Sequence, residues 1–549
     1  MQQNLIAQAE AWLAEDPDSE TRDELAKLIE ARDLDALADR FSGTLQFGTA
    51  GLRGELGAGP MRMNRAVVIR AAAGLAAYLK GKGQGDGLVV IGYDARYKSA
   101  DFARDTAAVM TGAGLRAAVL PRPLPTPVLA YAIRHLGAVA GVEVTASHNP
   151  PRDNGYKVYL GDGSQIVPPA DAEIATEIAA VASLDDVPRA ESGWETLGDE
   201  VLEAYLARTD AVLTPGSPRT ANVVYTAMHG VGKDVVLAAW ERAGFPAPVL
   251  VAEQAEPDPA FPTVAFPNPE EPGAMDLAFA TARRARPDIV IANDPDADRC
   301  AVAVPDDSAE GGWRMLRGDE VGALLAAHLV HKGATGTFAE SIVSSSLLGR
   351  IAEAAGLGYE ETLTGFKWIA RVEGLRYGYE EALGYCVDPG GVRDKDGVTA
   401  ALLVAELASE LKEQGRTLRD LLDDLAIAHG LHATDQLSVR VEDLSVIADA
   451  MRRLREQPPT SLAGLSVTSA EDLTEGSGKL PPTDGLRYYL DGAFKARVIV
   501  RPSGTEPKLK CYLEVVVPVG EASELADARA KGSQTLAAIK RDLAAAAGI

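Results

Sequence analysis

Cysteine is scarce in this sequence, with only Cys300, Cys386 and Cys511 among 549 residues. No two of them form a C-x-x-C pair, which argues against a disulfide framework and a thiolate zinc site and fits a reducing compartment. Long hydrophobic runs are also lacking, because no apolar stretch approaches the ~20 residues of a membrane helix. The acidic N-terminal segment lacks the basic and apolar regions of a signal peptide. We therefore expect a cytoplasmic protein without a membrane partner.

Positive charge is in short supply. The chain has 54 Lys and Arg residues against 79 Asp and Glu residues, a formal net charge of -25. Nucleic acids and anionic membranes attract proteins through a positive field, so neither is an expected partner. An anionic substrate would need a local basic pocket. The seven histidines show no H-x-x-x-H or similar zinc spacing.

Strand and helix patterns divide the chain into four parts. Polar helices over residues 1 to about 40 precede an α/β alternation that restarts near Asn222 and again near Thr335. From about Asp435 alternating strands and an Ala-rich helix indicate a smaller α+β module. The predicted domains are α/β over 1–212, 213–315 and 316–434, and α+β over 435–549.

The stretch TASHNPPRDNGYK, residues 145–157, follows an apolar strand and contains two prolines and a glycine. It is therefore a loop at a strand end, where open α/β sheets place ligands, and we expect Ser147 to be exposed there. The alternative is an ordinary turn whose polar side chains cap backbone groups. A serine hydrolase is disfavoured, because there is no G-x-S-x-G elbow and His148 is poorly placed as a base for its neighbour.

A second loop, NDPDADR at residues 293–299, follows the apolar strand DIVIA. Asp294, Asp296 and Asp298 alternate, so three carboxylates can turn towards one point, which would be costly without a cation and favours Mg²⁺ or Ca²⁺. An EF-hand loop is excluded, because its sixth position would be Arg299 and its twelfth Pro305. An acidic turn with side-chain caps is the alternative.

A third loop, RPSGTEPKLK at residues 501–510, brings a guanidinium, two hydroxyls and a glycine N–H together between two strands. This composition suits a phosphate cradle, although a polar hairpin turn would look similar. GTAGLRG at 48–54 presents Arg53 and could be an anion-binding loop or a mobile turn. The clusters GYEEALGY at 378–385 and VRDKDG at 392–397 are typical of solvated surface.

Taken together and in this order, GTAGLRG, TASHNPP, DPDADR, TGFKW, EEALGY, RDKDG and RPSGTEPKLK resemble the α-D-phosphohexomutase family. The resemblance is strongest to its phosphoglucomutase/phosphomannomutase branch, which includes phosphopentomutases, and spans residues from about 45 to 514. It implies three successive similar α/β domains with mixed sheets and a C-terminal α+β domain around a central cleft. It also implies a phosphosugar mutase that works through a phosphoserine.

The resemblance implies a role for individual residues. Ser147 matches the phosphoserine, and Asp294, Asp296 and Asp298 match the Mg²⁺ ligands, together with Ser147 itself. The basic residues implied at the phosphoryl-transfer site are Arg53, His148, Lys157, Lys395 and Arg299. Glu380 matches a sugar-hydroxyl contact. The residues implied to grip the phosphate that is not transferred are Arg501, Ser503, Gly504, Thr505 and Lys510.

One departure concerns the sugar. Many family members have Glu-x-Ser in the third-domain loop, whereas Ala382 stands at the serine position here. A site that lacks a hydrogen-bonding partner discriminates less sharply between sugars. The expected reaction is glucose 1-phosphate to glucose 6-phosphate, with mannose or pentose phosphates as alternatives. A metal-dependent sugar phosphatase and a binding protein without turnover are less favoured.

The resemblance further implies one Mg²⁺ per chain, and glucose 1,6-bisphosphate as activator and intermediate. The implied partners are small sugar phosphates, with a monomer or a homodimer as the working form.

Overall fold

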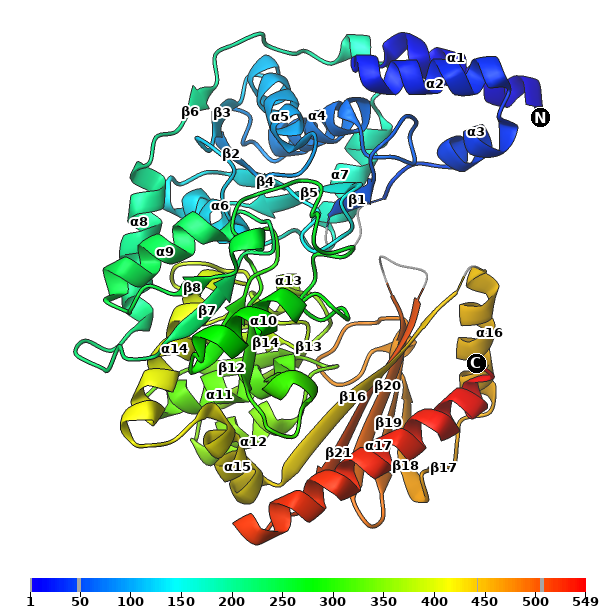
Figure 1. The fold of residues 1–549 in the computed structure, drawn as a ribbon. Helices are drawn as coiled ribbons and strands as arrows, with labels where there is room; N and C mark the ends of the chain where they lie inside the picture. Colours follow the sequence, from blue (N-terminus) through cyan, green and yellow to red (C-terminus); the bar gives the residue numbers. More distant parts are fainter. Residues whose placement is uncertain (1, 47–50, 442, 504–507) are drawn as a thin grey trace. The chain divides into compact units, whose positions relative to one another are not determined.

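The structure is a computed structural model that describes residues 2–46, 51–441, 443–503 and 508–549. The chain forms two compact units. Unit 1 is Met1–Met315 with Gly384–Ser409, and unit 2 is Leu316–Leu383 with Glu410–Ile549. Among the described helices, none combines the length and the apolar character that a bilayer crossing would require. Each unit contains both helices and strands (Figure 1).

Unit 1 opens with three polar helices, as the sequence predicts. They are α1 (Gln2–Glu15), α2 (Ser19–Ala31) and α3 (Leu34–Phe41). Asp18 and Asp33 cap α2 and α3, because their side chains accept hydrogen bonds from Glu20 N and Ala36 N. The apolar faces of the helices meet around Leu25, forming a small core of their own.

The first sheet of unit 1 has the strand order β1-β5-β4-β2-β3-β6. Strands β2, β3, β4 and β6 run parallel, while β5 is antiparallel to both β4 and β1, so the sheet is mixed. Its strands are β1 (Leu52–Glu55), β2 (Leu88–Tyr93), β3 (Arg116–Val119), β4 (Ala140–Val144), β5 (Asp153–Leu160) and β6 (Glu195–Thr196). The associated helices are α4 (Arg65–Gly81), α5 (Ser99–Gly112), α6 (Thr126–His135), α7 (Ala170–Ala179) and α8 (Glu200–Thr209).

The second sheet of unit 1 has the order β11-β10-β9-β7-β8. Strand β9 is parallel to β7 and antiparallel to β10, so this sheet is mixed as well. Its strands are β7 (Val223–Thr226), β8 (Val249–Leu250), β9 (Ile289–Ala292), β10 (Ala301–Pro305) and β11 (Trp313–Met315). The helices are α9 (Gly232–Ala243) and α10 (Asp276–Ala285). Strand β15 (Gly384–Cys386) and most of α14 (Gly397–Glu413) also belong to unit 1.

Unit 2 contains the third α/β part of the chain. Strand β12 has parallel neighbours on both sides, β13 and β14. The strands are β12 (Thr337–Ser341), β13 (Gly358–Thr362) and β14 (Leu375–Glu380). The helices are α11 (Gly318–His331), α12 (Leu347–Ala354), α13 (Phe366–Ile369) and α15 (Leu418–His429).

The C-terminal part of unit 2 is an antiparallel sheet in the order β16-β21-β20-β19-β18-β17. The long helix α17 lies along this sheet (Figure 1), and its buried residues share one core with the strands. The strands are β16 (Leu431–Arg440), β17 (Ser461–Leu462), β18 (Leu465–Asp472), β19 (Leu486–Asp491), β20 (Lys495–Pro502) and β21 (Lys508–Val517). The helices are α16 (Leu444–Glu456) and α17 (Leu525–Ala547).

The predicted fold class is therefore correct: three α/β parts with mixed sheets precede a C-terminal α+β part. The predicted domain boundaries stay a prediction. The segment Gly384–Ser409, which contains the RDKDG motif, groups with unit 1 although the strands before it group with unit 2.

Candidate active site

The serine loop follows β4 directly, at the strand end where the sequence predicts it. Ser147 is buried, with 3% of its surface exposed, so the expectation of an exposed serine is wrong. Its backbone has φ 50°, a conformation that is uncommon for residues other than glycine and that often occurs at functional sites. The Ser147 Oγ donates to Asp294 Oδ2 at 2.7 Å, and His148 Nδ1 lies 3.2 Å from the same oxygen. The expectation that His148 is poorly placed is therefore wrong too, because this αL turn brings its ring back to the hydroxyl.

Arg96 holds the serine loop in place. Its Nη2 donates to the carbonyl oxygens of Ser147 and Asn149, both at 2.6 Å, and its Nη1 donates to that of Pro150 at 2.8 Å. This arginine is not among the site residues that the sequence predicts. Its position just after the apolar strand β2, among polar residues, was the signal that could have found it.

The three aspartates of the NDPDADR loop follow β9 and form the acidic cluster of unit 1. All three are fully buried, at 0% exposure. They offer carboxylate oxygens that lie within 4.8 Å of one another. The Oδ1 atoms of Asp296 and Asp298 are buried and accept no hydrogen bond from any residue in the described ranges. Three buried carboxylates with unsatisfied oxygens fit a cation with hard oxygen ligands.

Two ammonium groups partly balance this cluster. Lys157 Nζ lies 2.8 Å from Asp296 Oδ2 and 3.1 Å from Asp298 Oδ2, and Lys395 Nζ lies 3.2 Å from Asp298 Oδ2. Burial would raise the pKa of Asp296, but Lys157 outweighs it and the pKa is lowered. Burial and the two neighbouring aspartates raise the pKa of Asp294 well above its usual value. Three carboxylates therefore face two ammonium groups.

The RDKDG loop is not solvated surface, contrary to the expectation. Lys395 is only 7% exposed. Asp394 beside it accepts hydrogen bonds from Tyr159 OH at 2.6 Å and Gln165 Nε2 at 2.9 Å. Asp396 accepts hydrogen bonds from Tyr205 OH at 2.9 and 3.0 Å. These tyrosines explain the burial, since aromatic hydroxyls replace the water that the two acids would otherwise require.

Two arginines complete this part of the site. Arg53 in β1 donates from Nη1 to Asn149 Oδ1 at 2.9 Å, and burial lowers its pKa. Arg299 donates from its backbone N to Asp294 Oδ1 at 3.1 Å, and its Nε lies 4.0 Å from Asp298 Oδ1. Unit 1 therefore gathers every site residue that the sequence predicts from its loops: Ser147, His148, Lys157, Arg53, Arg299, Lys395 and the three aspartates.

The predicted phosphate loop lies in unit 2 and joins β20 to β21. Arg501 and Lys510 are direct partners across this antiparallel pair. Like charges directly opposite each other in a sheet are destabilising. Among the described residues, no Asp or Glu forms an ion pair with Arg501 or Lys510. A bound anion would therefore relieve the repulsion between them. Ser503 donates from its backbone N to Lys508 O at 2.8 Å. Gly504 and Thr505 lie outside the described residues.

The predicted sugar loop follows β14, whose last residue is Glu380. The next residue, Glu381, is only partly exposed, so the expectation of a solvated surface fails here as well. Its Oε2 accepts from Ser341 Oγ at 3.2 Å and lies 3.5 Å from Ser344 Oγ. Its backbone N donates to Ser344 Oγ at 3.2 Å. The serines after β12 thus hold the loop that carries Glu380 and Ala382.

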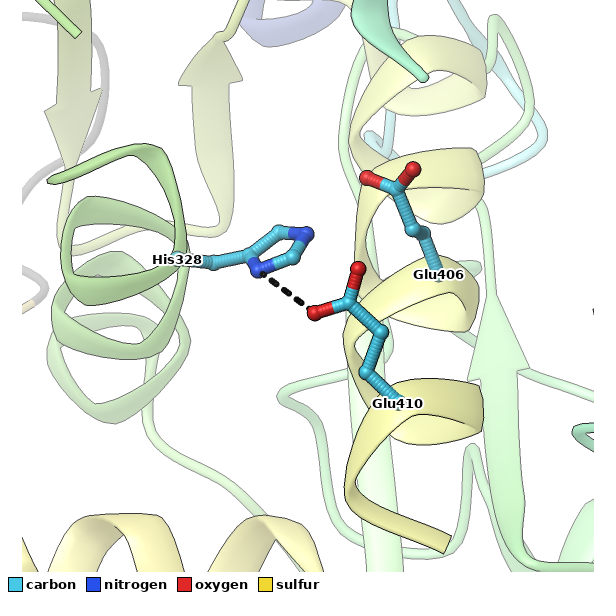
Figure 2. Close-up of side chains that lie close together, drawn as sticks. All are labelled: His328, Glu406 and Glu410. Carbon is cyan, nitrogen blue, oxygen red and sulfur yellow. Dashed lines mark ion pairs between the residues drawn. The ribbon is translucent and has the colours of Figure 1, made fainter. Parts of the chain in front are cut away.

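A histidine and a glutamate of unit 2, His328 and Glu410, form an ion pair away from the predicted motifs (Figure 2). His328 Nδ1 on α11 is 3.8 Å from Glu410 Oε2 on α14. Glu406 precedes Glu410 by one turn on the same helix, and within unit 1 it accepts hydrogen bonds from Thr214 N and Ser217 Oγ, both at 2.6 Å. These contacts give Glu406 a structural role within unit 1.

Four family models match the chain in sequence order. Their descriptions are Phosphoglucomutase/phosphomannomutase, alpha/beta/alpha domain I over residues 44–185, domain II over 203–309, domain III over 317–427, and C-terminal domain over 437–532. The chain belongs to the phosphoglucomutase/phosphomannomutase family. It is therefore an enzyme of the mutase type, an intramolecular phosphotransferase, and the predicted membership of the α-D-phosphohexomutases is correct.

Curated relatives and solved structures agree with this family. The chain is 50% identical over 461 residues to a Haemophilus influenzae protein named probable phosphomannomutase, covering 83% of this chain and 93% of that protein. It is 36% identical over 547 residues to a Schizosaccharomyces pombe protein named probable phosphoribomutase, covering 91% and 92%. A Thermus thermophilus structure whose name includes phosphomannomutase has a TM-score of 0.69 at 27% identity, covering 90% of this chain and 99% of that one.

Proposed function

We propose that this mutase interconverts glucose 1-phosphate and glucose 6-phosphate through phospho-Ser147 and a glucose 1,6-bisphosphate intermediate. The observation that supports it most is the hydrogen bond from Ser147 Oγ to Asp294 Oδ2 at 2.7 Å. This bond holds the Ser147 hydroxyl against the acidic cluster. A nucleophile held beside a cation site is the arrangement that phosphoryl transfer requires.

The acidic cluster is the proposed Mg²⁺ site, with Asp294, Asp296, Asp298 and Ser147 as ligands. Its orphaned carboxylate oxygens and hard donor set fit this ion, one per chain. When bound, Mg²⁺ neutralises charge on the phosphoryl oxygens.

The chain's own basic residues do the remaining work near Ser147. The phosphoryl group passes from the Ser147 oxygen to a free sugar hydroxyl: the phosphorus–Ser147 bond breaks as the new one forms, and the hydroxyl proton leaves to a nearby base. We assign this proton to His148, whose Nδ1 lies 3.2 Å from Ser147 Oγ. Burial lowers the pKa of His148 well below the usual value, which keeps its imidazole neutral. Arg53, Lys157, Lys395 and Arg299 supply positive charge to the transferring oxygens.

The phosphate that stays on the sugar is assigned to the loop between β20 and β21. Arg501 offers a bidentate guanidinium, and Lys510 faces it across the strand pair. Ser503, Gly504 and Thr505 would add hydroxyl and backbone donors. Because this loop recognises a phosphate and not a ring, the bisphosphate can bind in either orientation. A simple phosphatase would have no use for a second phosphate site, which makes that alternative less favoured.

The identity of the sugar is the finer part of the proposal. Relatives carry the names phosphomannomutase and phosphoribomutase, so mannose and pentose phosphates are the second candidates. The test is a set of coupled assays on the 1-phosphates of glucose, mannose, ribose and glucosamine, with the matching bisphosphate present. The highest kcat/KM for glucose 1-phosphate is expected. A value at least tenfold higher for mannose or ribose would overturn the glucose assignment while leaving the mutase reaction intact.

The remaining expectations concern the protein's setting. We propose that it acts on free sugar phosphates in the cytoplasm, as a monomer or a homodimer. Light scattering of the purified protein measures its oligomeric state, and a mass above that of two chains would contradict this proposal.

A further inference from the structure

One face of the C-terminal sheet carries buried charges. Arg497 on β20 and Glu514 on β21 are direct partners across the antiparallel pair, and they are 7% and 4% exposed. Arg497 and Arg501 are four residues apart on the same strand, so their side chains leave the same face. Buried charges are retained only where they are paired and hydrogen-bonded. The residues that bind Arg497 and Glu514 therefore show which segment this face of the sheet supports.

Both residues hold the serines that follow β12. Arg497 Nη2 donates to the carbonyl oxygen of Ser344, and Glu514 Oε1 accepts from Ser345 Oγ at 2.6 Å and from Ser346 N at 2.8 Å. Arg497 Nη2 lies 3.3 Å from Glu514 Oε2, and its Nη1 lies 3.0 Å from Glu361 Oε1. A guanidinium fork can serve three acceptors in fixed directions, which an ammonium group cannot.

The same serines hold the sugar loop. Ser344 Oγ accepts from Glu381 N at 3.2 Å, and Ser341 Oγ donates to Glu381 Oε2 at 3.2 Å. Asp319 Oδ1 fixes the segment from its other side by accepting from Ser345 N at 2.7 Å. A continuous set of contacts thus runs from the strand of the phosphate loop, through Arg497 and Ser344, to the residue next to Glu380.

Apolar packing makes this connection rigid. Ile499, which lies between Arg497 and Arg501 on β20, shares a buried cluster with Tyr512. Ile342 and Val343 of the serine segment belong to the same cluster. Close-packed side chains resist small displacements, so strand β20 and the serine segment cannot shift freely relative to each other.

We propose that Arg497, with Glu514, is a positioning residue for substrate selection: it fixes the spacing between Glu380, at the sugar, and Arg501, at the distal phosphate. This inference rests on the proposed function of those two loops. A hexose 6-phosphate has a six-membered ring and a pentose 5-phosphate a five-membered ring, so the hydroxyls across the ring from the phosphate lie at different distances from it. A fixed spacing selects between them. This selection would not require the serine hydroxyl that many family members have at the position of Ala382.

The test compares two lysine variants of buried arginines on the same sheet. Arg497→Lys keeps the positive charge but loses the planar guanidinium, whose N–H groups bind several acceptors in fixed directions. Arg487→Lys is the matched control, because Arg487 is equally buried and pairs with Glu471 at 2.7 Å and with Glu361 at 3.3 Å. Within the described residues Arg487 makes no hydrogen bond to the serine segment. Calorimetric Kd values for glucose 6-phosphate and ribose 5-phosphate, and kcat/KM for the corresponding 1-phosphates, are measured for each protein.

Arg497→Lys is expected to lower kcat/KM for the preferred sugar by roughly 10- to 100-fold, the scale of a displaced contact. It should also bring the two Kd values at least threefold closer together, while Arg487→Lys keeps the wild-type ratio. Hydrogen exchange of the peptide containing Ser341–Ser346 should accelerate only in the Arg497 variant. If Arg497→Lys does not fold, Glu514→Gln replaces it.

Unchanged Kd ratios and exchange in the Arg497 variant, or equal changes in both variants, would overturn the proposal. A wild-type enzyme that isomerises none of these sugars would instead refute the proposed function. The exchange of the serine segment would still decide whether Arg497 positions it.

Discussion

Ser147 combines burial, an αL backbone and a carboxylate partner, which together predict what its removal would do. Ser147→Ala should abolish mutase turnover, because it removes the hydroxyl that is proposed to carry the phosphoryl group. The fold should persist, since one hydrogen bond contributes only about 1 kcal/mol to stability. Activity and near-UV circular dichroism measure the two effects. Ser409→Ala is the control: Ser409 is also buried, but it bonds to Ala405 O at 2.8 Å on α14. Turnover of Ser147→Ala near the wild-type rate would rule out the covalent route.

The acidic cluster leads to a second prediction at the residue scale. EDTA should remove activity and Mg²⁺ should restore it, and Asp296→Asn should weaken Mg²⁺ binding because one of three anionic ligands is lost. Magnesium titrations followed by calorimetry measure this directly. Asp306→Asn is the matched control, because Asp306 lies at the end of β10 in the same part of unit 1 and is also buried. Zinc bound to the purified protein, with the best turnover in zinc, would contradict the assignment of the metal.

At the scale of elements, strand β20 leads into the proposed distal phosphate loop. Arg501→Ala should cost roughly 2 to 4 kcal/mol of kcat/KM, as for one member of a charged hydrogen-bonded pair. Glucose 1-phosphate and glucose 6-phosphate should be affected alike, because one loop serves both orientations of the intermediate. Lys495→Ala at the other end of β20 is the control, with unchanged kinetics expected. Impairment of a single direction would show that the two orientations use different phosphate sites.

The pairing of β20 with β21 also makes a pH prediction. Burial would raise the pKa of Glu514, but Arg497 outweighs it and lowers the pKa from 4.5 to about 2. A carboxylate whose pKa is lower in the folded than in the unfolded state stabilises the fold at pH values above the unfolded-state pKa. This stabilisation is lost as the pH falls from about 4.5 towards 2. It amounts to roughly 3 kcal/mol. The stability difference between wild type and Glu514→Gln should therefore shrink as the pH is lowered from 5 to 3. Thermal unfolding measures this, and a constant difference would argue against the charged pair.

At the scale of the whole molecule, local sequence patterns were enough to predict the fold and to locate the site motifs. Apolar strands followed by polar loops marked Ser147 and Asp294–Asp298, since a strand end is readable from sequence. Exposure was not readable, because the burial of Ser147 and Lys395 depends on partners far away in sequence, such as Asp294 and the tyrosine that faces Asp394. Arg96 was missed for the same reason: its four carbonyl acceptors lie about fifty residues further on.

The buried charges of unit 2 were equally out of reach of sequence analysis. Arg497 and Glu514 alternate with apolar residues along their strands, a pattern typical of solvent-facing positions. Only the tertiary fold shows that the serine segment covers them. The assigned roles of the site residues stay predictions until they are measured.

The central claim is that Ser147 carries the phosphoryl group between two hydroxyls of one sugar. The most direct measurement loads the enzyme with glucose 1,6-bisphosphate, isolates it, and adds glucose 6-phosphate in a single turnover followed by mass spectrometry. We predict that the peptide containing Ser147 first gains the mass of one phosphoryl group and then loses it, with glucose 1,6-bisphosphate as the product. Release of the group as inorganic phosphate, or its recovery on a residue other than Ser147, would contradict the account.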